Sequence, residues 1–353
     1  MSAPARVTPL FEPLLLRRVV LKNRVVMSPM LMYMAGDDGR VTDLHFVHYG
    51  ARIIGGVGAV MLEVVAVEPR GRISHRDLGL WEDAQIAGLK RLVDFAHACD
   101  CRIGIQLAHA GRKALLNAPI VAPSAIAYSD ESAIPAALGL EEIPDLIGAY
   151  RAATARAIEA GFDLVEVHAA HGYLLHEFLA PIANTRTDDY GGDLVGRARL
   201  PLEVIEAVRA AWPQDRPLLV RMSVTDHRTD AVTPEDALWF AQQLAARDVD
   251  LLDISAGNIV PGHPALVYPG YQLQYAERLK RDVGIRTATT GSIAAADLLE
   301  EALGAQRIDL AFVGRALLRN PFWLIDAARQ ASVDLVLPIP TYGRATGPYE
   351  RGF

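Results

Sequence analysis

Short runs of apolar residues alternate with longer segments whose apolar residues recur at helical spacing. A short, nearly continuous apolar run is typical of a strand that is covered on both faces. After two short strands predicted within residues 17–27 around a turn at Lys22 and Asn23, strands are predicted at residues 59–63, 103–107, 164–167, 218–222, 251–255, 286–290 and 310–313. The helical segments cover residues 43–54, 83–98, 144–160, 197–212, 234–247, 272–282, 294–304 and 321–331. The chain therefore repeats a strand followed by a helix.

This repeat predicts the fold class. Parallel strands covered by helices form an open sheet or a closed barrel, and eight strand-helix units favour closure. We therefore predict an α/β protein, a TIM (β/α)8 barrel preceded by an N-terminal β-hairpin. No shift in composition marks a second domain, so residues 1–353 are expected to form one domain. Residues 332–353, which contain several Pro and Gly, are expected to form an extended C-terminal arm.

Polar residues and glycines gather at the predicted carboxyl ends of the strands. In a barrel these ends share one face, where active sites are built. The residues at those ends are Ser28, Pro29, Met30, Gln106, His168, Arg221, Gly291, Ser292, Gly314 and Arg315. The glycine turns after the last two strands lie where such barrels bind phosphate, although glycine is also common at ordinary turns. The pattern predicts a binding site on this face, with a phosphate-binding part.

Arg221 ends an apolar strand and keeps its charge when buried, so it needs an anionic partner. That partner is Glu166 or Asp253 in a structural ion pair, or a bound anion or a ring that becomes anionic on reduction. Gln106 offers both a donor and an acceptor, which suits the imide edge of a ring or a structural hydrogen bond.

The segment 162–178 carries the densest group of chemically active side chains. His168 ends a predicted strand, and His171 and Tyr173 follow it closely in the turn after that strand. Two imidazoles can donate N–H groups to one substrate oxygen while the phenol supplies a proton. The same spacing also suits a metal site, and single histidines are often structural.

Composition narrows the class of partner. The chain has 353 residues and a net charge of −7, which gives no basic surface for nucleic acid or anionic lipid. Cys99 and Cys101 are too close together to staple a fold and lack a second pair for zinc or iron and sulfur. No apolar run approaches the ~20 residues of a membrane helix. We expect a cytoplasmic protein that acts on small molecules.

Several motifs together resemble one family. They are Ser28-Pro29-Met30 with Tyr33, the stretch Gln106 to Lys113 (QLAHAGRK), His168 to Tyr173 (HAAHGY), Gly314-Arg315 and Tyr349 to Phe353 (YERGF). In this order and spacing the chain resembles the old yellow enzymes, which are flavin-dependent ene-reductases, and most of all their thermophilic-like subgroup. The match runs nearly end to end.

The resemblance implies that FMN binds at the barrel mouth and that NAD(P)H reduces it. It places Ser28, Pro29, Met30, Leu31, Val64, Gln106, Arg221, Gly314 and Arg315 around FMN. Gly291 and Ser292 are added to the predicted cofactor site because they form the turn after a predicted strand. Leu31 is a departure, because relatives have cysteine or threonine there. Leucine cannot hydrogen-bond, so we expect a flavin that is harder to reduce.

For the substrate, the resemblance implies an α,β-unsaturated carbonyl compound. His168 and His171 would bind its carbonyl oxygen, hydride would arrive at the β carbon, and Tyr173 would protonate the α carbon. Tyr33 would also face the substrate. Arg351 resembles a residue that enters the active site of a neighbouring subunit, which implies a homodimer or homotetramer.

Two alternatives remain open on the sequence. A non-catalytic FMN-binding protein would retain the cofactor without turnover. A metal-dependent barrel hydrolase would use His168, His171 and His176, although no ordered spacing of a third ligand supports it and we expect no metal.

Overall fold

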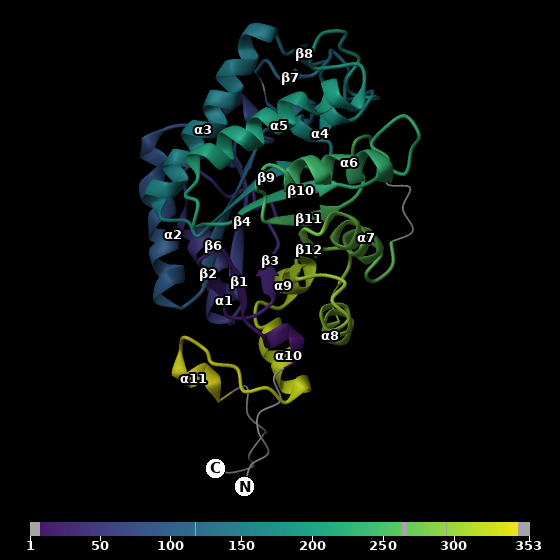
Figure 1. The fold of residues 1–353 in the computed structure, drawn as a ribbon. Coiled ribbons are helices and arrows are strands. Elements are labelled where there is room, and N and C mark those ends of the chain that lie inside the picture. Colours follow the sequence, from purple (N-terminus) through teal and green to yellow (C-terminus); the bar gives the residue numbers. More distant parts are fainter. Residues whose placement is uncertain (1–7, 117, 263–266, 294, 345–353) are drawn as a thin grey trace.

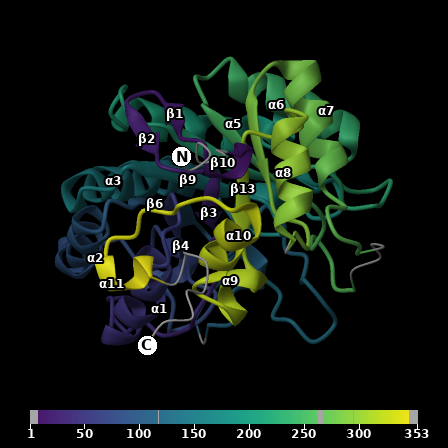
Figure 2. The same ribbon diagram turned by 90° about the horizontal axis from the view of Figure 1, so that it is seen from below.

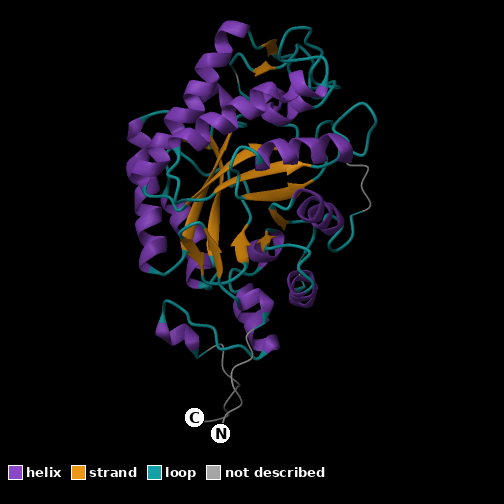
Figure 3. Cartoon of the chain, in the orientation of Figure 1, coloured by secondary structure: helices purple, strands orange, loops and turns teal. Residues whose placement is uncertain are grey.

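Eight parallel strands close into a barrel in the computed structural model, which describes residues 8–116, 118–262, 267–293 and 295–344 (Figure 1). The order around the barrel is β3, β13, β12, β11, β10, β9, β6 and β4, and β3 pairs with β4 to complete the ring. Helices surround the strands on the outside (Figure 3). The predicted TIM barrel is confirmed.

The barrel strands are β3 (Val25–Met27), β4 (Ala59–Ala66), β6 (Arg102–Ala108), β9 (Leu164–Ala169), β10 (Leu218–Ser223), β11 (Leu251–Ser255), β12 (Arg286–Thr289) and β13 (Leu310–Val313). The longer helices are α1 (Asp43–Ile54), α2 (Ile86–Ala98), α3 (Ile143–Ala160), α5 (Leu194–Ala211), α6 (Pro234–Ala245), α7 (Leu273–Val283), α8 (Ala296–Gly304) and α10 (Trp323–Ala331). The bounds agree with the predicted segments to within a few residues at most ends.

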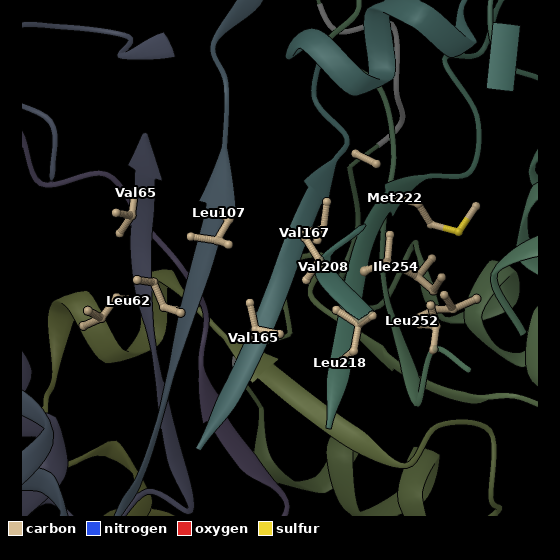
Figure 4. Packing of buried hydrophobic residues seen from close by; sticks show 14 of the residues in the cluster. Leu62, Val65, Leu107, Val165, Val167, Val208, Leu218, Met222, Leu252 and Ile254 are labelled. Carbon is tan, nitrogen blue, oxygen red and sulfur yellow. The ribbon is translucent and has the colours of Figure 1, made fainter. Parts of the chain in front are cut away.

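Alternation along each strand divides its side chains between two cores. Val165 and Val167 of β9 belong to the large apolar cluster between the strands and the helices (Figure 4). Leu164, on the other face of β9, belongs to a separate apolar cluster with residues of six other barrel strands. Because side chains point alternately to opposite faces, Glu166 and His168 share the inner face with Leu164.

The N-terminal hairpin differs in position from the prediction. It consists of β1 (Leu14–Leu16) and β2 (Val19–Leu21), which pair antiparallel, so the turn lies at Arg17 and Arg18 rather than at Lys22 and Asn23. Asn23 instead leads into β3: its side chain donates to the Gly56 carbonyl at 2.9 Å and accepts from the Val25 amide at 3.1 Å. Leu14, Leu16, Val19 and Leu21 join the inner apolar cluster at the amino end of the barrel. The backbone of the hairpin, β1 and β2, can be followed in Figure 2.

Shorter elements build the loops. The excursion after β6 contains a 3₁₀ turn (Gly111–Lys113) and the paired strands β7 (Val121–Ala122) and β8 (Ala136–Ala137), and β5 (Leu78–Gly79) extends the sheet beside β4. Further 3₁₀ turns lie at Pro9–Phe11, Pro69–Gly71, Asp83–Gln85 and Leu140–Glu142. Short helices α4 (Leu174–Leu179) and α9 (Arg315–Arg319) follow β9 and β13, and α11 (Pro340–Gly343) lies in the C-terminal segment. No helix of the described chain could span a bilayer.

Candidate functional site

On the inner faces of three neighbouring strands, side chains of the same chemical kinds follow one another in nearly the same order. From the amino to the carboxyl end, β9 presents Leu164, Glu166 and His168, β10 presents Leu219, Arg221 and Ser223, and β11 presents Leu251, Asp253 and Ser255. The register aligns Arg221 with both His168 and Asp253. The interior therefore changes from apolar to charged to hydrogen-bonding toward the mouth.

The charged layer is almost completely buried and only partly paired. Arg221 Nε lies 3.1 Å from Asp253 Oδ2, and Gln106 Nε2 donates to Glu166 Oε1 at 2.7 Å. Burial and the charge of Asp253 raise the pKa of Glu166, and burial raises that of Asp253 against the attraction of Arg221. Of the two ion pairs that the sequence left open for Arg221, the structure thus forms the one with Asp253.

The histidine pair lies above this layer. His171 Nδ1 is 3.3 Å from His168 Nε2, and the two rings meet edge to face. Tyr173 also packs edge to face on His168, with ring centroids 5.0 Å apart. Burial, and next the charge of Arg221, lower the pKa of both histidines well below the usual value, so both imidazoles are neutral at pH 7.

A tight turn after β9 aims these side chains. His171 and Gly172 have left-handed φ values of 59° and 72°. A Cβ atom at position 172 would collide with the Asn258 carbonyl oxygen, so only glycine fits there. The His171 amide donates to Ser223 Oγ at 3.1 Å, and Lys113 Nζ donates to the His171 carbonyl at 2.9 Å. The left-handed backbone of His171 is therefore held from two sides.

A cavity of about 490 Å³ opens at this end of the barrel. It is lined by the residues that the sequence predicted for cofactor and catalysis: Ser28, Pro29, Met30, Leu31, Val64, Gln106, His168, His171, Tyr173, Arg221, Gly291, Ser292, Gly314 and Arg315. Tyr33 does not line the cavity and is 49% exposed, so its contact with substrate stays a prediction. Arg351 lies outside the described residues, and its entry into a neighbouring subunit likewise stays a prediction.

Several further lining residues were missed by the sequence reasoning. The polar ones among them include Ser255, Asn258, Tyr271, Gln272 and Arg319. Ser255 ends a strand that was predicted correctly. It is a polar residue at the carboxyl end of a strand, so the reasoning that identified His168 as a site residue could have identified Ser255 as well. Gln272 and Arg319 carry no such signal. Gln272 immediately precedes α7 and Arg319 ends α9, and the approach of these helices to the mouth depends on the closed barrel.

His176, the third candidate metal ligand, has other partners. Its Nδ1 accepts from the Gly172 amide at 2.9 Å, and its Nε2 lies 3.2 Å from Asp226 Oδ2. Among the described residues no group of three His, Cys, Asp or Glu side chains is arranged to hold a metal ion.

Comparison with known proteins identifies the family. The profile of the NADH:flavin oxidoreductase / NADH oxidase family matches residues 9–333. The chain belongs to this family. It is 47% identical over 341 residues to an NADPH dehydrogenase of Bacillus cytotoxicus, covering 96% of this chain and 97% of that protein. An NADPH dehydrogenase of Bacillus subtilis is 43% identical over 346 residues, covering 98% of this chain and 99% of that one.

Solved structures agree with this result. Morphinone reductase superimposes with a TM-score of 0.79 at 30% identity, over 95% of this chain and 93% of that chain. The predicted membership of the old yellow enzyme family is therefore confirmed. The chain is an FMN-dependent oxidoreductase that takes electrons from NAD(P)H.

The residues of the cavity fit FMN. Two cations, Arg315 and Arg319, lie where the phosphate is expected. Arg315 donates a hydrogen bond to Ser292 Oγ at 2.7 Å. Gly314 leaves room beside Met30, since a Cβ atom there would lie 3.3 Å from its sulfur. The apolar side chains of Met30, Leu31 and Val64 also line the cavity, and Gln106 and Arg221 offer polar groups to a ring edge.

Proposed function

We propose that the protein is an ene-reductase that reduces the C=C bond of an α,β-unsaturated carbonyl compound. One observation carries the proposal. Two neutral imidazoles, with facing nitrogens 3.3 Å apart, line the same cavity as a phenol and a buried arginine. Two donors at that separation can both reach a single carbonyl oxygen at hydrogen-bond distance.

The histidines would act on the oxygen of the substrate. Addition of hydride to the β carbon moves negative charge onto the carbonyl oxygen, which becomes an enolate. Preorganised N–H donors stabilise that charge more strongly than they bind the neutral ketone, and this difference lowers the barrier. Because His168 and His171 are neutral, they polarise the oxygen without protonating it. FMN, when bound, would supply the hydride that NAD(P)H has delivered.

Tyr173 would complete the reaction. Burial raises the pKa of its phenol, so the group keeps its proton at pH 7 and can donate it to the α carbon. The ammonium of Lys113 lies 5.1 Å from the centroid of the Tyr173 ring. A cation at this distance is positioned to stabilise negative charge that develops on the phenol as its proton leaves.

The two half-reactions separate this proposal from a protein that binds FMN without catalysis. The FMN-loaded protein is bleached anaerobically with NADPH or NADH, and reoxidation by enones and maleimides is followed by stopped flow. In Tyr173→Phe we expect reoxidation by alkenes to slow by roughly 10²-fold or more, while bleaching changes little.

Tyr190→Phe is the matched control, because this phenol hydrogen-bonds to Glu203 at 3.1 Å and does not line the cavity. It should reoxidise at the wild-type rate. A wild-type protein that is bleached by NAD(P)H but is not reoxidised by any alkene of the panel would contradict the proposal.

A further inference from the structure

His171 has two ring nitrogens with different surroundings. Nδ1 faces His168 Nε2, whereas Nε2 lies 2.6 Å from the hydroxyl oxygen of Ser255. Because the neutral ring carries one proton, a proton on Nδ1 makes the ring a donor toward the cavity. A proton on Nε2 makes it an acceptor there. The position of this proton decides whether the pair offers a substrate oxygen two free N–H donors or none.

His168 already has a determined tautomer. Its Nδ1 accepts a hydrogen bond from the Ala170 amide at 3.1 Å, so its single proton lies on Nε2. If Nδ1 of His171 were bare, this proton would be taken up in a hydrogen bond between the two rings. The pair would then have no free donor for a substrate oxygen.

A chain of hydrogen bonds from the end of β12 resolves the choice. Thr290 Oγ1 donates to Gln272 Oε1 at 3.1 Å, so the amide nitrogen of Gln272 points the other way. That nitrogen donates to Tyr271 Oη at 2.9 Å and lies 3.4 Å from Ser255 Oγ as a second donor. Ser255 Oγ thus accepts from Gln272, and among its contacts with the described residues His171 Nε2 is the acceptor that its own proton can reach.

We propose that Ser255, oriented by Gln272, is a positioning residue that donates to His171 Nε2 and keeps the proton of His171 on Nδ1. His168 Nε2 and His171 Nδ1 then both carry a proton and face the same position in the cavity, and neither nitrogen accepts a hydrogen bond from the other. An oxygen atom that enters this point accepts from both, and a negatively charged oxygen gains most. This inference rests on the proposed function for its catalytic meaning, but the tautomer itself is independent of turnover.

The direct test is the protonation pattern of His171 in FMN-loaded protein with ¹⁵N-labelled histidine. Long-range ¹H–¹⁵N spectra separate protonated from bare ring nitrogens, and the signals of His171 are those that disappear in His171→Gln. We expect Nδ1 protonated and Nε2 bare in the wild type and in Ser255→Thr, and the reverse in Ser255→Ala. Ser223→Ala is the matched control, because Ser223 contacts the His171 backbone and should leave the ring pattern unchanged.

A second variant keeps the hydroxyl and reverses its direction. Gln272→Glu, measured with excess FMN, replaces the amide donor by a carboxylate that accepts the Ser255 proton. We expect His171 to move its proton to Nε2 although Ser255 is intact. A wild type with the proton on Nε2, or an unchanged pattern in both Ser255→Ala and Gln272→Glu, overturns the inference.

Kinetics show whether the tautomer matters. If the productive tautomer falls to about a tenth of the population, Ser255→Ala slows reoxidation by alkenes roughly tenfold. In a His171→Ala background the same substitution should change the rate less than twofold, because the ring on which Ser255 acts is gone. Equal losses in both backgrounds contradict a role through His171. If the NMR pattern is as expected but no alkene is reduced, the proposed function fails and the assignment of the tautomer stands.

Discussion

The two ends of the barrel interior are made from the same strands but are built in opposite ways. At the amino end Leu164, Leu219 and Leu251 pack with the hairpin residues Leu14 and Leu16 in a closed apolar cluster. At the carboxyl end the same strands bury ionisable and hydroxyl side chains beside an open cavity.

The energetic consequences differ as much as the chemistry. A fully buried leucine stabilises a fold by ~1.5–3 kcal/mol. A buried ion pair such as that of Arg221 and Asp253 contributes little net stability, because the loss of hydration cancels most of the attraction. The apolar amino end therefore contributes more to the stability of the barrel. The charged side chains at the carboxyl end contribute little stability, but they can bind a charged ligand.

The largest expected effect is that of Arg221→Met. It leaves Asp253 without its cation and removes a group expected at the flavin edge, so we expect a loss of roughly 3–5 kcal/mol in unfolding free energy and of most FMN binding. Arg209→Met is the control, since Arg209 is also buried and lies 3.6 Å from Asp250 at the amino end. It should destabilise the fold while the folded protein keeps its FMN affinity, measured by absorbance titration. Equal FMN loss in both variants would break the comparison.

Leu219→Ala tests the opposite end. The cavity that it leaves in the amino-end cluster should lower the unfolding free energy by about 2–5 kcal/mol, as measured by urea denaturation. At temperatures where the variant is fully folded, its FMN affinity and its rate of reoxidation by alkenes should equal those of the wild type. A change in either would show that the two ends are coupled.

The pH dependence of stability should arise mainly at the carboxyl end. Burial raises the pKa of Glu177, beside the cavity loops, to about 8 from a usual 4.5. The folded state then holds a proton that the unfolded state has lost, so stability falls by about 1.4 kcal/mol per pH unit as pH rises from 4.5 toward 8.

Glu177→Gln keeps the acceptor for the Arg112 amide and should remove this part of the slope. The measurement is the unfolding free energy at pH 5, 6, 7 and 8. Glu159→Gln, at an exposed carboxyl group, should follow the wild-type curve. An identical slope in Glu177→Gln and wild type would contradict the assignment.

The smallest expected effect concerns Leu31, which packs on an apolar cluster that includes Ile73 and Ala110 beside Tyr173. Leu31→Cys places a thiol where the wild type has no hydrogen-bonding side chain. We expect a small rise in the midpoint potential of the bound flavin, measured by dye-linked reduction, with no change in unfolding free energy beyond about 1.5 kcal/mol. An unchanged potential would remove the role that we assign to this position.

Much of this architecture was predictable from local pattern. The strand and helix segments repeat clearly, and residues such as His168 and Arg221 mark strand ends because they interrupt apolar runs. The hairpin turn was misplaced because Lys22 and Asn23 resemble a turn locally. Asn23 instead hydrogen-bonds to Gly56, a residue of the loop before the next barrel strand.

By itself the sequence determined the types and order of the elements and most residues of the cavity, because strand ends in a barrel meet at one face. Only the tertiary structure decided which polar groups pair. It joined Arg221 to Asp253, Gln106 to Glu166, and His171 through Ser255 to Gln272. These contacts link residues 17 to 84 positions apart, and they follow from strand register and barrel closure, which no local pattern encodes.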